Sequence, residues 1–164
     1  MGVIHNFIER NKEFADKFRH GDKAMPPATH LAVLTCMDAR IHPEQAMGMD
    51  IGDAHMIRNA GGRASDDAIR SLVISTTLLG TEEFAVIHHT DCGMLTFTNE
   101  DLRKKLSDER GVDASGVDFL PFPDLEQSVR DDVSTIKASS LLPDGIEVTG
   151  WIYDVKTGNI SPVP

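Results

Sequence analysis

The residues best suited to chemistry lie in two short stretches, "CMDAR" at 36–40 and "HHTDCG" at 88–93. Cys36 and Cys92 are the two cysteines of the chain, and His89 lies three residues before the second of them. Two thiolates and one imidazole are good zinc donors, and three protein ligands leave a fourth tetrahedral position for water or substrate. Structural zinc sites usually fill all four positions, so a set without a third cysteine favours a catalytic centre.

The first stretch also carries Asp38 and Arg40 at alternate positions. An aspartate beside an arginine is held ionised and oriented by a charge-assisted hydrogen bond. Two residues from a metal ligand, Asp38 can accept a hydrogen bond from a zinc-bound water, or it can move onto the metal as a fourth ligand. The sequence leaves both roles open.

The elements that must position these side chains follow from the apolar pattern. Three short apolar runs predict buried strands, and segments with helical periodicity lie before, between and after them. Ser65 suits the start of the helix between the second and third strands, and Gly80 suits its end. The expected strands are 30–36, 54–62 (the last residues a glycine turn), 83–89 and two in 147–163; the expected helices lie within 6–18, 65–80, 98–111 and 123–142.

Continuous apolar strands that alternate with helices predict an α/β fold with a mostly parallel β-sheet core flanked by helices on both faces. In such sheets, ligands bind beyond the carboxyl ends of the strands. Cys36 ends the first expected strand and His89 ends the third. If those two strands are neighbours, the three donors converge at one edge of the sheet.

Composition narrows the classes of function. A chain of 164 residues is long enough for one domain with a real core, which we expect to span residues 1–164. A net charge of -10 argues against a nucleic-acid partner. No apolar run approaches the ~20 residues of a membrane span, and the first residues lack the pattern of a secretory signal. We therefore expect no membrane association and a cytoplasmic location.

"CMDAR", "RNAGG" at 58–62 and "HHTDCG" together resemble the β-class carbonic anhydrases, whose motifs are Cys-x-Asp-x-Arg and His-x-x-Cys. The resemblance is close over residues 31–95. It implies Zn²⁺ held by three ligands, of which the histidine is His89 and not His88, and a catalytic pair beside them. The implied metal ligands are Cys36, His89 and Cys92, and the implied catalytic pair is Asp38 and Arg40.

The activity implied by the resemblance is the reversible hydration of carbon dioxide to bicarbonate by zinc-activated hydroxide. The short chain and "HHTDCGMLTF" are similar to a compact branch that includes carbonyl sulfide hydrolases, so hydrolysis of carbonyl sulfide at the same site is the alternative. A non-catalytic zinc or thiol redox module is a third interpretation. The Asp38–Arg40 pair disfavours it, because a structural site has no use for that pair.

The resemblance also implies a pocket wall and an assembly. Small residues at Ala60 and Gly61 leave room for substrate, and Leu95 with Met94 offers a flexible apolar wall. Relatives of this kind form homodimers or homotetramers, so we expect one of these states and a small-molecule substrate. His88 is expected to be a core histidine.

Overall fold

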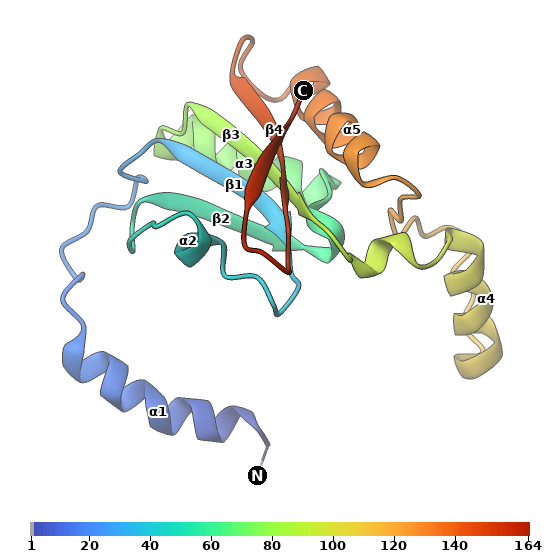
Figure 1. Cartoon of the computed structure of the whole chain (residues 1–164), viewed down its shortest axis with the longest axis horizontal. Coiled ribbons are helices and arrows are strands. Elements are labelled where there is room, and N and C mark those ends of the chain that lie inside the picture. The colour runs from blue at the N-terminus through green and yellow to red at the C-terminus, as the bar shows by residue number, and fades with distance from the viewer. Residues whose placement is uncertain (1) are drawn as a thin grey trace.

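The computed structural model describes residues 2–164. The strands are β1 (Leu31–Cys36), β2 (Ala54–Asn59), β3 (Glu83–His89), β4 (Glu147–Tyr153) and β5 (Ile160–Val163). The helices are α1 (Ile4–Lys17), α2 (Pro43–Ala46), α3 (Asp66–Leu79), α4 (Asn99–Arg110) and α5 (Leu125–Ala138), with short 3₁₀ turns η1 (Ala60–Gly62) and η2 (Gly93–Leu95). The strands form one sheet at the centre of the molecule (Figure 1).

The sheet order is β2-β1-β3-β4-β5, and every neighbouring pair is parallel except β4 with β5. The chain runs from β1 to β2 on one side and then crosses to β3 on the other side of β1. The topological switch point therefore lies between β1 and β3, where ligands of open α/β sheets bind. This confirms the predicted fold class and makes the two strands that carry Cys36 and His89 neighbours.

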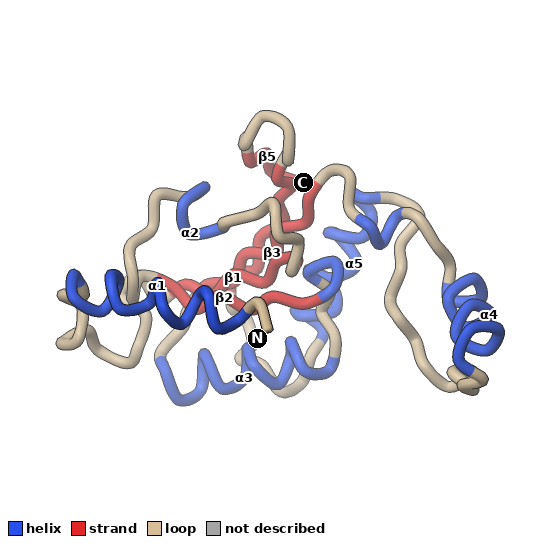
Figure 2. The backbone as a smooth tube through the Cα atoms, turned by 90° about the horizontal axis from the view of Figure 1, so that it is seen from below, coloured by secondary structure: helices blue, strands red, loops and turns tan. Residues whose placement is uncertain are grey.

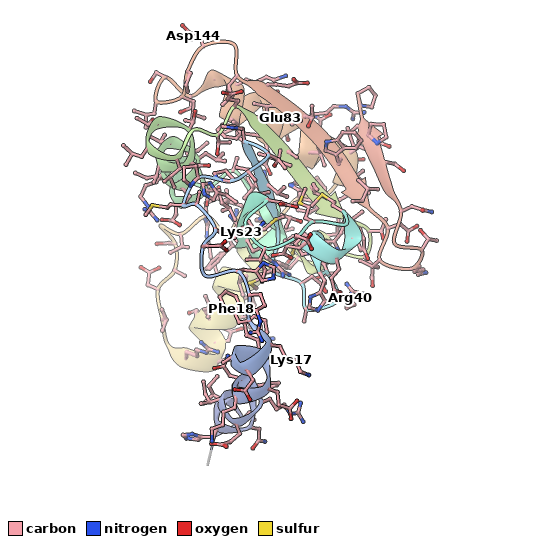
Figure 3. The ribbon with its side chains drawn as sticks, turned by 90° about the vertical axis from the view of Figure 1, so that its left-hand side faces the viewer. Lys17, Phe18, Lys23, Arg40, Glu83 and Asp144 are labelled. Atoms are coloured by element: carbon pink, nitrogen blue, oxygen red, sulfur yellow. The ribbon has the colours of Figure 1, made fainter. Side chains whose placement is uncertain are left out.

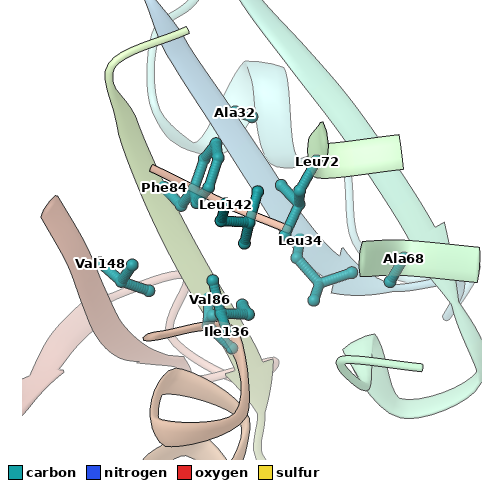
Figure 4. Packing of buried hydrophobic residues seen from close by; sticks show 9 residues of the cluster. All are labelled: Ala32, Leu34, Ala68, Leu72, Phe84, Val86, Ile136, Leu142 and Val148. Atoms are coloured by element: carbon teal, nitrogen blue, oxygen red, sulfur yellow. The ribbon is translucent and has the colours of Figure 1, made fainter. Parts of the chain in front are cut away.

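The main core lies between the sheet and two helices. Figure 2 shows α3 and α5 on the same side of the strands. Figure 4 shows these packed apolar side chains, which come from alternate strand positions, from α3 and α5, and from the segment that follows α5. The buried members of this core are Ala32, Leu34, Ala68, Leu72, Phe84, Val86, Ile136, Leu142 and Val148.

The other face of the sheet has less cover. Val33, Ala85 and Ile87 are buried there, with Met47 and Trp151 packed against them. The short helix α2 lies on this side and was not predicted from the sequence, because four residues are too few to show a helical period. Helices thus flank the sheet unequally.

The ends of α3 agree with the sequence signals. The Ser65 side chain accepts a hydrogen bond from the Ala68 backbone N–H, and Gly80 ends the helix in the left-handed conformation with a φ of 71°. Glycine adopts that conformation without the steric cost that a Cβ would bring.

Helix α1 forms where the sequence predicted it, but its apolar side packs against no core in this chain. Phe7 and Phe14 are each 55% exposed, and no residue of α1 is buried. Figure 3 shows the helix projecting away from the sheet beyond Phe18. Among residues 2–164, no helix has the length and apolar character needed to cross a membrane.

Candidate metal centre

Three metal-binding side chains meet at the carboxyl end of the central strands. Cys36 ends β1, His89 ends β3, and Cys92 follows in the turn after β3. Their ligand atoms all lie within 4.8 Å of one another, and all three residues are buried. A tetrahedral zinc ion with bonds of ordinary length needs such donors about 3.5–3.8 Å apart. The group is therefore compact enough to close on zinc with small movements.

His89 is oriented as a ligand. Its Nδ1 lies 2.9 Å from the backbone carbonyl of Thr90 and donates to it, which leaves the lone pair on Nε2. Within the described part of the chain, that buried Nε2 has no hydrogen-bond partner. Buried polar atoms are rarely left without a partner, and a metal ion would satisfy this one. The two thiols and the unpartnered nitrogen of His89 together fit Zn²⁺.

The two thiols shift each other's pKa in opposite directions. The Cys92 thiol lowers the pKa of Cys36, and the nearby His89 ring and backbone N–H groups act in the same direction. The pKa of Cys92 is raised because its thiol donates to Cys36 and because it is buried. Burial lowers the pKa of His89, but the nearby Cys36 sulfur outweighs this and the net shift is upward. The forms that would bind zinc are the thiolates and the neutral imidazole.

Asp38 and Arg40 form a two-point ion pair beside the donors. Arg40 Nε donates to Asp38 Oδ1 at 3.0 Å and Nη2 donates to Oδ2 at 2.8 Å. The Arg40 hydrogen bond keeps the pKa of Asp38 below its usual range, so the carboxylate is ionised at neutral pH. Figure 3 shows Arg40 at the opposite end of the sheet from Glu83, where β3 begins. The pair lies where the sequence placed it.

Comparisons with known proteins agree with this geometry. The sequence profile of the carbonic anhydrase family matches residues 31–115. The chain is 39% identical to beta-carbonic anhydrase 1 of Mycobacterium tuberculosis over 99% of both sequences. The chain belongs to the β-carbonic anhydrase family.

Two further relatives describe the range of the family. The crystal structure of carbonic anhydrase from Streptococcus mutans is 49% identical, with a TM-score of 0.94 over 100% of this chain and 99% of that one. A carbon disulfide hydrolase of Acidianus is 36% identical over 94% of this chain and 88% of its own. The relatives of this chain thus include proteins named for two different activities.

Two residues support the Asp38–Arg40 pair that the sequence reasoning did not assign to it. Asp91 Oδ2 accepts from Arg40 Nη1 at 2.6 Å. Arg58 donates to the backbone carbonyls of Cys36 at 2.9 Å and Asp38 at 2.8 Å. Asp91 lies in the turn after β3 and has a φ of 56°. The sequence clue to the role of Arg58 is its position as the first residue of "RNAGG".

The glycine turn η1 approaches the donors. The Gly61 N–H donates to Cys36 Sγ at 3.3 Å. A Cβ on Gly62 would lie 2.9 Å from the backbone carbon of Thr35, so only glycine fits there. Ala60, in contrast, is exposed to solvent.

Leu95 is half-buried and packs against the apolar cluster around the two cysteines, which also contains Met94 and Phe122. It lines a cavity of about 510 Å³ together with Phe97 and Phe122. Of the three expected pocket residues, Gly61 and Leu95 therefore lie at the apolar cluster, while Ala60 faces outward.

His88 lies on the opposite face of β3 from His89, because adjacent strand residues point to opposite sides. It is fully buried, and its ring nitrogens lie 2.7 Å from Ser128 Oγ and 3.2 Å from the Gly62 carbonyl. It is a core histidine, as the sequence predicted.

Proposed function

We propose that this chain is a zinc enzyme that hydrates carbon dioxide reversibly to bicarbonate, with Cys36, His89 and Cys92 as metal ligands. The observation that carries the proposal is the buried His89 Nε2, which lacks a hydrogen-bond partner among residues 2–164, faces two thiols and lies 3.8 Å from Asp38 Oδ2. A structural zinc site does not require an ionised carboxylate held by an arginine beside it.

When bound, zinc supplies Lewis acidity that makes hydroxide available from water near neutral pH. The hydroxide oxygen adds to the carbon of carbon dioxide, and the electron pair of one C–O π bond moves onto oxygen, which gives bicarbonate. Asp38 is the catalytic residue that accepts a hydrogen bond from the attacking O–H and so directs its lone pair at the substrate. Arg40 is a positioning residue, because it holds Asp38 ionised and in place.

The test measures carbon dioxide hydration by one zinc-loaded sample before and after the zinc is removed. Carbon dioxide hydration with kcat/KM in the usual enzyme range of ~10⁴–10⁸ M⁻¹s⁻¹ supports the proposal. The chelator-treated protein should lose the activity, and added zinc should restore it. Full activity of a sample that contains no zinc contradicts the proposal.

Hydrolysis of carbonyl sulfide at the same site is the second candidate. The 36% identity to a carbon disulfide hydrolase favours it, because that relative's name assigns it a linear sulfur-containing substrate. Sulfide release from carbonyl sulfide and from carbon disulfide should be measured on the same sample. Rapid sulfide release with feeble carbon dioxide hydration would reverse the order of the two candidates.

The proposal includes a single domain over residues 1–164, a cytoplasmic location and a homodimer that can pair into a homotetramer. One sheet order joins all five strands into a single layer, which supports one domain. Both cysteines are unpaired thiols, which suits a reducing compartment. The exposed apolar side of α1 supports contact with a second copy of the chain.

A further inference from the structure

A buried ion pair lies on the other side of β3 from the metal donors. Arg63 Nε donates to Asp132 Oδ2 at 2.7 Å, and Arg63 Nη2 donates to Oδ1 at 3.2 Å. The two side chains are 13% and 4% exposed. Neither residue has a part in the proposed function. The cost of removing two charges from water offsets much of the attraction in a buried ion pair. Stability alone therefore does not explain why this pair is present.

His88 joins this pair and ties three elements together. Its Nε2 lies 3.1 Å from Asp132 Oδ2 and 3.2 Å from the Gly62 carbonyl. The Ser128 hydroxyl donates to the Leu125 carbonyl, so Ser128 Oγ is an acceptor for His88 Nδ1 at 2.7 Å. The contacts connect β3, the η1 turn and α5. They leave no free polar atom on the imidazole.

Arg63 also holds the loop that precedes α5. Its Nη1 donates to the Leu120 carbonyl at 2.7 Å. Leu120 has a φ of 58°, in the left-handed region that residues with a Cβ rarely adopt. The hydrogen bond from Arg63 therefore holds a strained residue of this loop in place. The Arg63 guanidinium carbon lies 5.4 Å from the centre of the Phe122 ring, which stacks on His88 with ring centres 5.5 Å apart.

Phe122 and η1 lie beside the thiols: Phe122 belongs to the same buried cluster as Cys36, Cys92 and Met94. A Cβ built on Gly61 would lie 2.8 Å from Met94 Cγ and 3.3 Å from Phe122 Cε1, so both side chains lie close against the turn at Gly61. The Gly61 N–H points from the same residue to Cys36 Sγ at 3.3 Å. Hydrogen bonds to a ligand sulfur and the apolar shell around it tune a metal centre.

We propose that Arg63 and Asp132 are positioning residues for the metal centre. With His88, their buried ion pair holds the Gly61 N–H on the Cys36 sulfur and holds Phe122 against the apolar side of the thiols. The inference rests on the proposed function for the assignment of Cys36 as a ligand. It predicts that loss of the pair alters the metal centre itself, although neither residue touches it.

The experiment compares cobalt-substituted proteins, because thiolate-to-cobalt absorption bands report the environment of the ligand sulfurs. Asp132→Asn keeps the shape and removes the charge. Arg63→Lys keeps the charge but cannot bind Asp132 at two points and Leu120 at a third. The matched control is Asp67→Asn, which breaks an Arg70–Asp67 pair with the same 2.7 Å Nε–carboxylate bond on the exposed side of α3.

We expect shifted charge-transfer bands and zinc affinity reduced about 10–100-fold in Asp132→Asn, measured by competition with a chromophoric chelator. Arg63→Lys should show the same changes to a smaller degree, and Asp67→Asn should match the wild type. If Asp132→Asn does not fold, the double variant R63M/D132L replaces the pair by apolar side chains of similar size, which folds tolerate well. The double variant should still show the shifted bands.

A structural role alone would give a different result. Folded variants with wild-type bands and wild-type zinc affinity, whatever their resistance to urea, would overturn the inference. The spectra and affinities need no turnover, so the two proposals can fail separately. A wild type that binds cobalt but whose zinc-loaded form does not hydrate carbon dioxide would end the proposed function, and altered bands in its variants would still support the positioning role.

Discussion

Asp38 Oδ2 lies 3.8 Å from His89 Nε2, although the two residues are 51 positions apart in the chain and lie at the ends of different strands. The parallel register of β1 and β3 brings them to one edge of the sheet. Arg40 holds the carboxylate from the outer side with two hydrogen bonds. The Asp38 oxygen thus faces the position that the three donors surround.

Asp38→Asn should retain zinc and lower kcat/KM for carbon dioxide hydration by about 10²-fold or more, because the amide cannot replace an ionised acceptor. Stopped-flow hydration assays and metal analysis of the same sample measure both quantities. The control is Asp91→Asn, which removes a solvent-exposed partner of Arg40 but leaves the Asp38–Arg40 pair intact. An exposed pair contributes at most about 1 kcal/mol, so the control should lose less than about fivefold. Equal losses in the two variants would contradict the special role of Asp38.

Replacement of Cys36, His89 or Cys92 by Ala should lower the zinc content well below the expected value of about one per chain. Two remaining protein donors bind zinc too weakly to survive dialysis. His42→Ala is the control, since His42 is exposed and lies outside the donor group. Plasma mass spectrometry of the dialysed proteins gives the zinc content. A single variant that keeps one zinc per chain would remove that residue from the ligand set.

Gly62→Ala should destabilise the fold far more than Gly145→Ala. Both glycines have positive φ, 70° and 78°, so both variants carry the strain of about 1–3 kcal/mol that a left-handed residue costs. At Gly62 the new Cβ would also meet backbone atoms of Thr35 and Cys36 at 2.9–3.0 Å, whereas nothing lies within 4 Å at Gly145. Urea unfolding of the two variants measures the difference. Equal losses would show that η1 can move away from β1.

The stability that Asp132 contributes should depend on pH. Burial raises the pKa of Asp132, but hydrogen bonds from His88 and Arg63 outweigh this and lower it below its usual value. A carboxyl group with a lowered folded-state pKa stabilises the fold above its unfolded pKa, near 3.9, and this stabilisation is lost as the pH falls through the folded value. The difference in unfolding free energy between wild type and Asp132→Asn should therefore be largest above about pH 5 and should shrink below about pH 4. Urea titrations of chelator-treated protein across this range measure it, and a constant difference would contradict the charged pair.

The sequence predicted much of the site because its signals were local. Cys36 and His89 each end an apolar run, and the switch-point rule for parallel sheets then placed them together. The tie between Arg63 and Asp132 could not be predicted, because 69 positions separate the two residues and only the packing of α5 on β3 brings them together. The four residues of α2 carried no period, and the apolar side of α1 could not show whether it faces this chain or another. The exposure of Ala60 depends on the path of one turn, which composition does not define.

The apolar side of α1 should mediate the proposed homodimer. Phe7 and Phe14 are seven residues apart, so they lie on the same side of the helix, and each is 55% exposed. A stable dimer interface buries about 800 Å² on each partner and excludes charge from its centre. The double variant F7D/F14D should therefore shift the chain from dimer to monomer in sedimentation equilibrium at micromolar concentration.

The control N6D/K12D also places two aspartates on α1, outside its apolar side, and changes the net charge by -3 against -2 in F7D/F14D; Lys12 pairs with Glu9 at an exposed position. It should leave the dimer intact, because charged residues outside the apolar side remain in water. Circular dichroism separates a lost interface from a lost helix, because unfolding of the 14 residues of α1 would lower the helical signal. A dimer that survives F7D/F14D with the same dissociation constant as the wild type would place the interface on another surface of the molecule.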